Sequence, residues 1–335
     1  MPSAQNISNK ATIKPHTKMA DYNEGNKITV RKLISDEDEK YERFEEHWKY
    51  GFKKDGVIVI PAEYDDAWYF SEGVAAVERD CMWGYIDTAG NTVVPFRFDF
   101  ARPFIEGLAR VEIANKFGYI DHAGNEVLPI IYDYVGDFRD GLAIVELDEK
   151  YGFIDRAGNM VIPIKYDDGW DFNEGLAAVS NDGKWGFIDR AGNEVIPFLY
   201  DEIWQFSEGL AAVKLDGKWG FIDTAGKEVV PFKYDDARHF SEGLARVLQN
   251  GKWGYIDRTG NEVVPFKYDA AEAFSEGLAE ALRNHKWGFI DRAGKEVIPF
   301  IFDCTSEFEN GKAAVKLDGK PGTIDKQGNF TPEEE

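Results

Sequence analysis

Carboxylates recur at two fixed positions of this sequence, once in every 34 residues. The first ladder follows an isoleucine: Asp87, Asp121, Asp155, Asp189, Asp223, Asp257, Asp291 and Asp325. The second follows an aromatic residue: Asp65, Asp99, Asp133, Asp167, Asp201, Asp235, Asp269 and Asp303. Stacked carboxylates are suited to Ca²⁺, which takes about six to eight oxygen ligands. Neither the EF-hand loop nor the nonapeptide calcium repeat occurs, so we favour the alternative that each aspartate caps its own turn.

A second set of candidates changes from one repeat to the next. Two residues before a repeated phenylalanine stand Trp68, Arg102, Gly136, Trp170, Trp204, Arg238, Glu272 and Ser306. A purely structural position would be expected to repeat its residue. Trp170, Trp204 and Arg238 occupy three consecutive repeats, and they form one aromatic and cationic stripe if equivalent loops align. Trp and Arg are typical anchors of binding surfaces, so we predict binding residues at Trp68, Arg102, Trp170, Trp204 and Arg238. The alternative is that each Trp packs over the neighbouring proline.

Aromatic residues also recur before a glycine, before the second aspartate and before a Glu-Gly step. Such rings are able to stack on sugars. Their presence in nearly every repeat instead favours packing between repeats, because buried aromatic rings dominate core energetics.

The element that positions these residues is a repeat marked by an aromatic-Gly pair. The pair occurs at Tyr50, Trp83, Phe117, Tyr151, Trp185, Trp219, Trp253 and Trp287, with Pro321 in the same register; the first step is 33 residues and every later step 34. A fixed period of this length indicates a repeat array. The sequence therefore contains about eight full units and a partial one.

Turn chemistry predicts three antiparallel strands in each unit. In the unit around Trp219, the run 210–215 ends at Asp216-Gly217, a strong hairpin signal. The next run ends at Thr224-Ala225-Gly226, where Asp223 caps the turn. The third run, 228–234, contains Pro231, which places that strand at an edge or a bulge. The fold class is thus all-β, with tandem three-stranded meanders joined by connections of about ten residues.

Alternation along the first strand predicts one core face and one mostly wet face. Units of this kind must stack to share a core. An open, curved β-solenoid-like array and a closed eight-bladed β-propeller both satisfy this requirement. We favour the open array, because the partly polar second face is unlike one enclosed between two blades.

The segment before the repeats differs in composition. Residues 1–24 are predicted to be a disordered arm, with Met19 as a possible alternative start, and residues 25–49 an N-terminal cap of a strand and a short helix. The helix is predicted over 36–47, with Ser35 as its N-cap and an acidic first turn. Tyr41, Phe44 and Trp48 line one side of it at helical spacing. The array then covers 50–330, and 331–335 form an acidic tail.

The unit resembles the WG repeat, a bacterial β-repeat family named for a Trp-Gly pair that follows Lys, as in Lys184-Trp185-Gly186 and Lys218-Trp219-Gly220. The resemblance covers residues 50 to about 330 and includes the Gly-x-x-Val-Ile-Pro and Phe-x-Glu-Gly-Leu-Ala elements. It implies a binding role and brings no catalytic residues. Tyr50, Phe117, Tyr151 and Pro321 depart from the pattern, so the tryptophans as such are weak candidates for a functional site.

Composition limits the function classes. The chain has 39 Lys+Arg and 61 Asp+Glu, a net charge of −22, which disfavours nucleic acid and anionic membranes. No catalytic or cofactor motif occurs, so no enzyme activity and no cofactor are expected. With two cysteines, no leader and no apolar span, a cytoplasmic protein is expected. We predict a non-enzymatic scaffold for a protein or peptide partner. The alternatives are glycan binding by exposed aromatics and a hydrolase with a central-channel site.

Overall fold

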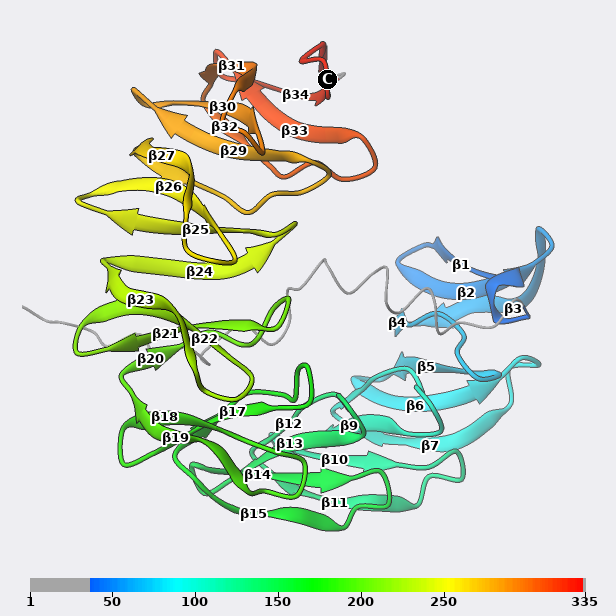
Figure 1. Ribbon diagram of the computed structural model, residues 1–335. Helices are drawn as coiled ribbons and strands as arrows, with labels where there is room; N and C mark the ends of the chain where they lie inside the picture. Colours follow the sequence, from blue (N-terminus) through cyan, green and yellow to red (C-terminus); the bar gives the residue numbers. More distant parts are fainter. Residues whose placement is uncertain (1–36, 334–335) are drawn as a thin grey trace, which may run out of the picture. The chain divides into compact units, whose positions relative to one another are not determined.

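The computed structural model describes residues 37–333, and they form antiparallel β-sheets (Figure 1). The only helical segment in this range is the 3-10 helix η2 (Asp38–Lys40). The chain comprises two compact units, residues 1–130 and 131–335, and each is described by itself. No helix in 37–333 is long and apolar enough to cross a membrane.

The first unit begins with a three-stranded sheet of order β1-β2-β3 and continues with the sheets β4-β5-β6-β7 and β11-β10-β9-β8. The strand bounds are β1 (Tyr41–Glu46), β2 (Lys49–Lys54), β3 (Val57–Tyr64), β4 (Asp66–Ala67), β5 (Val74–Arg79), β6 (Met82–Asp87), β7 (Thr92–Phe98), β8 (Phe100–Ala101), β9 (Ala109–Ile113), β10 (Lys116–Ile120) and β11 (Glu126–Tyr132).

The second unit contains six four-stranded sheets, whose strands pair in chain order from β12 to β35. The bounds of the first twelve strands are β12 (Tyr134–Val135), β13 (Leu142–Leu147), β14 (Lys150–Asp155), β15 (Met160–Tyr166), β16 (Asp168–Gly169), β17 (Ala177–Asn181), β18 (Lys184–Ile188), β19 (Glu194–Tyr200), β20 (Glu202–Ile203), β21 (Leu210–Leu215), β22 (Lys218–Asp223) and β23 (Glu228–Tyr234). Those of the rest are β24 (Asp236–Ser241), β25 (Leu244–Gln249), β26 (Lys252–Asp257), β27 (Glu262–Tyr268), β28 (Ala270–Ala271), β29 (Leu278–Arg283), β30 (Lys286–Asp291), β31 (Glu296–Phe302), β32 (Cys304–Thr305), β33 (Lys312–Leu317), β34 (Lys320–Asp325) and β35 (Phe330–Pro332).

The predicted fold class, an all-β array of tandem antiparallel repeats, is confirmed. Residues 37–333 hold one three-stranded and eight four-stranded sheets, and none of these sheets closes into a barrel. The predicted meander supplies three strands of each four-stranded sheet. The fourth is a short strand inside the connection, such as β20, which pairs with β21 through Glu202↔Lys214 and Ile203↔Val213.

Both predicted turns are present. Asp216 and Gly217 have φ of 50° and 77°, the left-handed pair that a type I′ hairpin requires. In the next turn, the Gly226 N–H donates to the Asp223 carbonyl at 2.8 Å and Gly226 has φ of 78°. This is the type I turn with a glycine bulge that the sequence predicts.

The repeated proline lies on the last strand of its sheet, which is an edge strand, as predicted. The pairing between β22 and β23 also shifts register on both sides of Phe221, so this strand carries a bulge as well. At the bulge, β23 approaches Gly220 so closely that a Cβ there would lie 2.7 Å from the Val230 carbonyl oxygen. Close backbone approach therefore requires the glycine of the aromatic-Gly pair.

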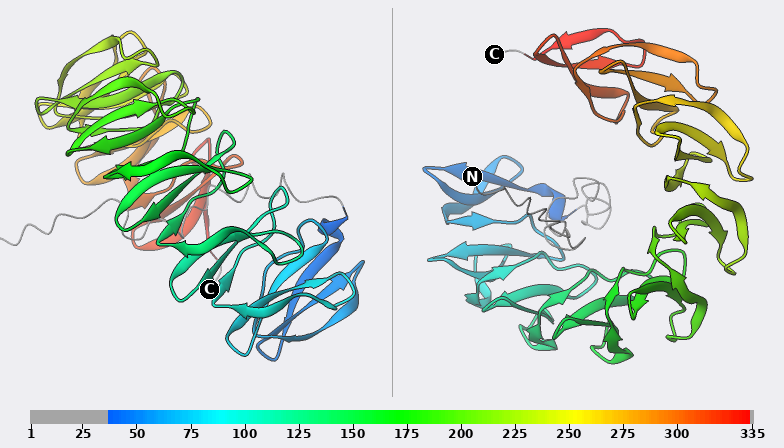
Figure 2. Two further views of the ribbon diagram at one scale, coloured as in Figure 1. Left: turned by 90° about the horizontal axis from the view of Figure 1, so that it is seen from below. Right: turned by 90° about the vertical axis from the view of Figure 1, so that its left-hand side faces the viewer.

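Within the second unit, consecutive sheets lie one after another (Figure 2) and pack face to face. They are also joined by hydrogen bonds. The Ser207 hydroxyl donates to the Phe240 carbonyl at 2.8 Å, and the Gly209 N–H donates to the Glu174 carboxylate at 2.9 Å. The same two bonds recur in later sheets of the unit. The first joins residues 33 positions apart, and the second joins residues 35 positions apart. The glutamate of each Glu-Gly step thus links its sheet to the following sheet by a hydrogen bond.

The expectation of a mostly wet second face on the first strand is wrong. Ile144, Ala178 and Ala212 lie on that second face by alternation, yet they are at most 3% exposed. A neighbouring sheet covers each side, so the first strand of an interior sheet is buried on both faces. The polarity of this strand therefore does not favour the open array over the propeller.

The predicted helix over 36–47 is also wrong. Beyond η2, residues 41–46 form β1, which pairs with β2 through Phe44↔Gly51, just as Val213 pairs with Gly220. His47 and Trp48 form the hairpin turn with positive φ. Long-range strand pairing overrides the local helical spacing of the aromatics, and the first sheet starts at residue 41 rather than 50. The predicted disordered arm, Ser35 and the end of the acidic tail lie outside the described residues.

Candidate binding surface

In β16–β19 and β20–β23 the changing position follows the two-residue strand and is held by a backbone hydrogen bond, whereas Arg238 lies within the longer strand β24. The N–H of Trp170 donates to the Ala178 carbonyl at 2.9 Å, and that of Trp204 to the Ala212 carbonyl at 2.8 Å. The corresponding side chains in successive sheets consequently occupy equivalent places, as the prediction of a stripe requires.

The structure brings three of the predicted residues together in the second unit. The rings of Trp170 and Trp204 meet edge to face with centroids 6.0 Å apart, and the Arg238 guanidinium lies 5.1 Å from the Trp204 ring centroid. All three side chains are partly buried. We call Trp170, Trp204 and Arg238 the stripe. Edge-to-face rings and a stacked guanidinium are favourable contacts, so the stripe is a preorganised surface.

Sequence reasoning missed further residues that extend the stripe. Arg238 also lies 5.8 Å from the Trp253 ring, and Arg246 lies 5.9 Å from the same ring. Arg246 donates to the Glu272 carboxylate and to the Ala271 carbonyl of the next sheet. The sequence did contain a signal for Arg246. The strand residue that faces the changing position varies together with it: Arg246 accompanies Arg238, and Glu280 accompanies Glu272.

Trp68 and Arg102 belong to the first unit. The Trp68 ring contacts Phe100 at 6.4 Å, and the Arg102 carbonyl accepts the Tyr85 hydroxyl at 2.8 Å. In each predicted Trp position the facing strand residue is alanine, namely Ala76, Ala178 and Ala212, all buried. Each Trp therefore fills space beside a small residue and belongs partly to the packing between sheets.

The first aspartate ladder caps turns, as predicted. The Asp189 carboxylate accepts the N–H groups of Ala191 and Asn193, each at 2.9 Å, and the Asn193 amide. The Asn193 side-chain amide and then its backbone N–H hold the Asp189 pKa below its usual value. Within residues 37–333, no group of three or more His, Cys, Asp or Glu side chains has the geometry of a metal site.

The second ladder joins each sheet to the next hairpin. The Asp201 carboxylate accepts Lys184 at 2.6 Å and the Gly217 N–H at 3.3 Å. The Lys184 ammonium is the main cause of the lowered Asp201 pKa. Both ladders thus have structural partners.

Two of the three aromatic ladders are core, as favoured. Phe206, before the Glu-Gly step, and Tyr234, before the second aspartate, are 1% exposed, and the Phe240 ring lies 4.9 Å from the Phe221 ring of the preceding sheet. In the ladder before glycine, Trp219 is 4% exposed, whereas Trp185, Trp253 and Trp287 are partly buried. The fully buried rings are therefore closed to sugars.

Two ionisable groups lie near the stripe in unusual surroundings. Glu280 is 6% exposed, and burial raises the pKa of its carboxyl. His239 is exposed, and partial desolvation, followed by the positive charges of Arg246 and Arg238, lowers the pKa of its imidazole. Glu280 therefore keeps its proton to a higher pH than a free carboxyl does, and His239 loses its proton at a lower pH than a free imidazole does.

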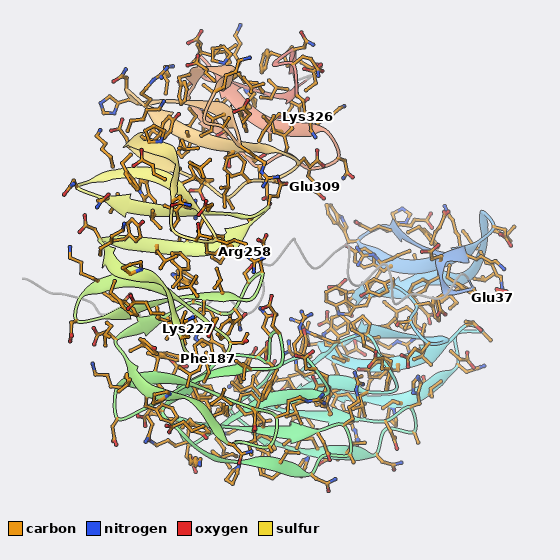
Figure 3. All side chains as sticks on the ribbon, in the orientation of Figure 1. Glu37, Phe187, Lys227, Arg258, Glu309 and Lys326 are labelled. Carbon is orange, nitrogen blue, oxygen red and sulfur yellow. The ribbon has the colours of Figure 1, made fainter. Side chains whose placement is uncertain are left out.

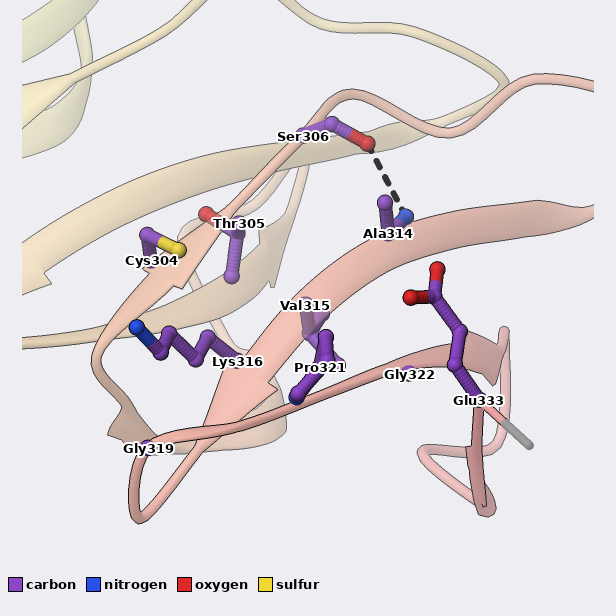
Figure 4. Close-up of a pocket in the computed structure, with 10 residues that line it drawn as sticks. All are labelled: Cys304, Thr305, Ser306, Ala314, Val315, Lys316, Gly319, Pro321, Gly322 and Glu333. Carbon is purple, nitrogen blue, oxygen red and sulfur yellow. Dashed lines mark hydrogen bonds between the residues drawn. The ribbon is translucent and has the colours of Figure 1, made fainter. Parts of the chain in front are cut away.

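A hollow of about 340 Å³ lies on the last sheet (Figure 4). Its walls include Cys304, Ser306, Ala314 and Pro321, and the Ser306 hydroxyl accepts the Ala314 N–H at 2.9 Å. Ser306 and Ala314 are both small, whereas the equivalent pair in β20–β23 is Trp204 with Ala212. The hollow is the space that a Trp side chain fills in an interior sheet.

Comparison with known proteins identifies the repeats. The model of the WG containing repeat matches eight segments: residues 52–80, 83–117, 117–151, 151–185, 185–219, 219–253, 253–287 and 287–320. A crystal structure of a eukaryotic initiation factor is similar in fold, with 15% identity, a TM-score of 0.50, and coverage of 77% of this chain and 82% of that chain. Hsv2 of Kluyvelomyces marxianus has 10% identity, a TM-score of 0.41, and coverage of 68% and 93%. No curated protein matches the sequence.

Proposed function

We propose that this chain, which belongs to the WG repeat family, is a non-enzymatic scaffold that binds a protein or peptide partner through the stripe. The repeat β-fold provides the scaffold. Partner binding is the role that we assign to the side chains that change between repeats.

The observation that carries the proposal is the continuous contact from Trp170 through Trp204 to Arg238. The aspartate and aromatic ladders have structural partners in their own or adjacent sheets, so their repetition follows from packing. The stripe differs, because it joins three consecutive sheets with residue types that anchor protein interfaces. Partly buried rings also lose little conformational entropy when a partner covers them.

The test begins with a partner recovered by the full-length chain from a lysate of its source and then purified. Calorimetric titration compares the wild type with the triple variant Trp170→Ala, Trp204→Ala and Arg238→Ala. We expect the triple variant to bind at least about a hundredfold more weakly, since several hot-spot side chains are removed.

A matched control changes Val195, Leu199 and Val263 to Ala. These side chains are 37–50% exposed and lie on edge strands of the same unit. The control is expected to bind within about threefold of the wild type, a change of about 0.7 kcal/mol or less. Equal binding by the wild type and a folded stripe variant contradicts the proposal. Binding of a glycan array instead of any protein supports the glycan alternative.

A further inference from the structure

The stripe already holds a guanidinium between an aromatic ring and a carboxylate. Arg238 lies over Trp204 and donates to the carboxylate of Asp236. The same arrangement occurs twice more, at Arg246 with Trp253 and Glu272, and at Arg43 with Tyr50 at 4.8 Å and Asp66 at 3.6 Å. These internal arginines indicate that the aromatic and acidic groups of these connections accommodate a cationic side chain, such as a guanidinium.

A second feature is a basic residue that reaches the Glu-Gly step of an earlier sheet. We call this step the corner and its acidic residue, Glu or Asp, the corner acid. Lys326 pairs with the Glu276 carboxylate at 3.0 Å and donates to the Glu276 carbonyl at the same distance. Arg258 donates to the Glu208 carbonyl, and Figure 3 labels Arg258 and Lys326 on their turns. Arg190 and Arg292 lie beside Gly141 and Gly243 in the same way. Each of these residues follows its corner acid by 50 positions.

Glu174 is the exception among the corner acids of residues 131–333. The residue 50 positions on is Thr224, whose short neutral side chain supplies no cation. Glu174 accepts the Gly209 N–H at 2.9 Å and is otherwise exposed. This corner therefore offers a carboxylate to a cation from outside the chain.

The Glu174 corner and the stripe lie on the same two connections. The Gln205 amide donates to the Asp171 carbonyl at 3.2 Å, and the Asn173 amide donates to the Phe206 carbonyl at 2.7 Å. These bonds hold the segment from Trp170 to Glu174 against the next connection. Four residue steps span at most about 14 Å, so one short extended peptide reaches both the tryptophans and Glu174.

We infer that the partner presents a basic segment, with one Arg or Lys on the Trp170–Trp204 pair and a second at Glu174. This inference rests on the proposed function and names the chemistry of its partner. The net charge of −22 favours encounter with such a segment. An acidic or purely apolar segment leaves Glu174 without a counter-charge.

The test uses acetylated decapeptides of Gly and Ser that carry three Arg, three Gln or three Glu at the same positions. Binding to the full-length chain is followed by Trp fluorescence at two salt concentrations. We expect the Arg peptide to bind at least about tenfold more tightly than the Gln peptide and the Glu peptide to bind most weakly, with the difference reduced at high salt.

Thr224→Arg provides the decisive variant, because it places at 224 the cation found in the neighbouring repeats. It is expected to lower affinity for the Arg peptide by about fivefold, the value of an exposed ion pair. The matched control is Thr88→Arg, the same change in the first unit, which leaves affinity unchanged. Equal affinity for Arg and Glu peptides, or no effect of Thr224→Arg, overturns the inference.

The two proposals fail separately. A partner that needs the stripe, together with Arg peptides that do not bind, refutes the basic segment and leaves the scaffold function standing. Arg peptides that bind, together with a natural partner insensitive to the stripe variant, refute the scaffold function at this site.

Discussion

The sheet β20–β23 and the last sheet, β32–β35, have the same strand order but different outer residues. Trp219 and Phe221 of the interior sheet are at most 4% exposed. The equivalent positions in the last sheet hold Pro321, which is exposed, and Thr323, which is partly buried. The interior sheet has a following sheet to pack against within its unit, and the last sheet does not.

This difference shows what the repeated aromatics do. Where a neighbouring sheet exists, aromatic rings fill the interface. Where it is missing, proline and threonine replace them and a hollow remains. This side of the last described sheet therefore presents small and polar side chains.

The largest expected effect comes from the interior ring. Phe221→Ala removes a fully buried side chain that packs against Phe240 and should destabilise by about 3–5 kcal/mol. Thr323→Ala in the last sheet should cost less than about 1 kcal/mol. Urea unfolding of both variants measures the contrast. Similar losses from both would remove the distinction between the interior and terminal sheets.

The aromatic-Gly glycine gives a second contrast. Gly220→Ala places a Cβ 2.7 Å from the Val230 carbonyl oxygen on a strand of seven residues, so the strand must shift at a cost of about 1–3 kcal/mol. Gly322→Ala meets the Thr331 carbonyl at 2.5 Å, but β35 has three residues and moves more easily. We expect about half the cost there, measured by urea unfolding. A larger loss at Gly322 would contradict this explanation.

Filling the hollow with a large side chain should make the last sheet more stable and its packing more like that of an interior sheet. Ser306→Trp recreates the pairing of Trp204 with Ala212, since Ala314 already occupies the strand position. We expect a gain of about 0.5–1 kcal/mol and slower hydrogen exchange in β33, read by mass spectrometry. Faster exchange in β33 would show that the hollow does not correspond to the Trp204 space.

The smallest expected effect is on the stability of the fold at low pH. The Thr259 hydroxyl that donates to Asp257 is the main cause of its pKa of about 2. Because the folded pKa lies below the unfolded value of about 3.9, this cap stabilises above pH 4 and its contribution disappears as pH falls toward 2. Thr259→Ala should move the acid transition of this sheet to higher pH. An unchanged transition, followed by hydrogen exchange, would exclude this role of the hydroxyl. Asp325 of the last sheet, whose pKa is lowered mainly by Asn329, provides the comparison.

Much of the fold was predictable because its signals are local. Asp216-Gly217 fixes a hairpin, Gly226 fixes a bulged turn, and Pro231 assigns its strand to an edge. The helix predicted over 36–47 failed for the opposite reason. The spacing of Tyr41 and Phe44 is local, whereas their partners in β2 are defined only by strand pairing.

The short strands and the burial of the second face were beyond local patterns for a related reason. A two-residue strand such as β20 is too short to show an alternating pattern. The local sequence around Ala212 is the same whether a sheet or water covers this residue, so it does not predict burial. The stripe was predictable as three changing residues in consecutive repeats. The roles of Arg246 and Glu272 were not, because their contact joins two sheets.

Hydrogen exchange of the chain with and without its purified partner tests the central claim most directly. We predict that the partner slows exchange in the connections at 167–176, 201–209 and 235–243, and that the edge strands β19, β23 and β27 keep their free rates. Protection confined to those edge strands or to the first unit, with unchanged exchange around Trp170, Trp204 and Arg238, would contradict the assignment of binding to the stripe.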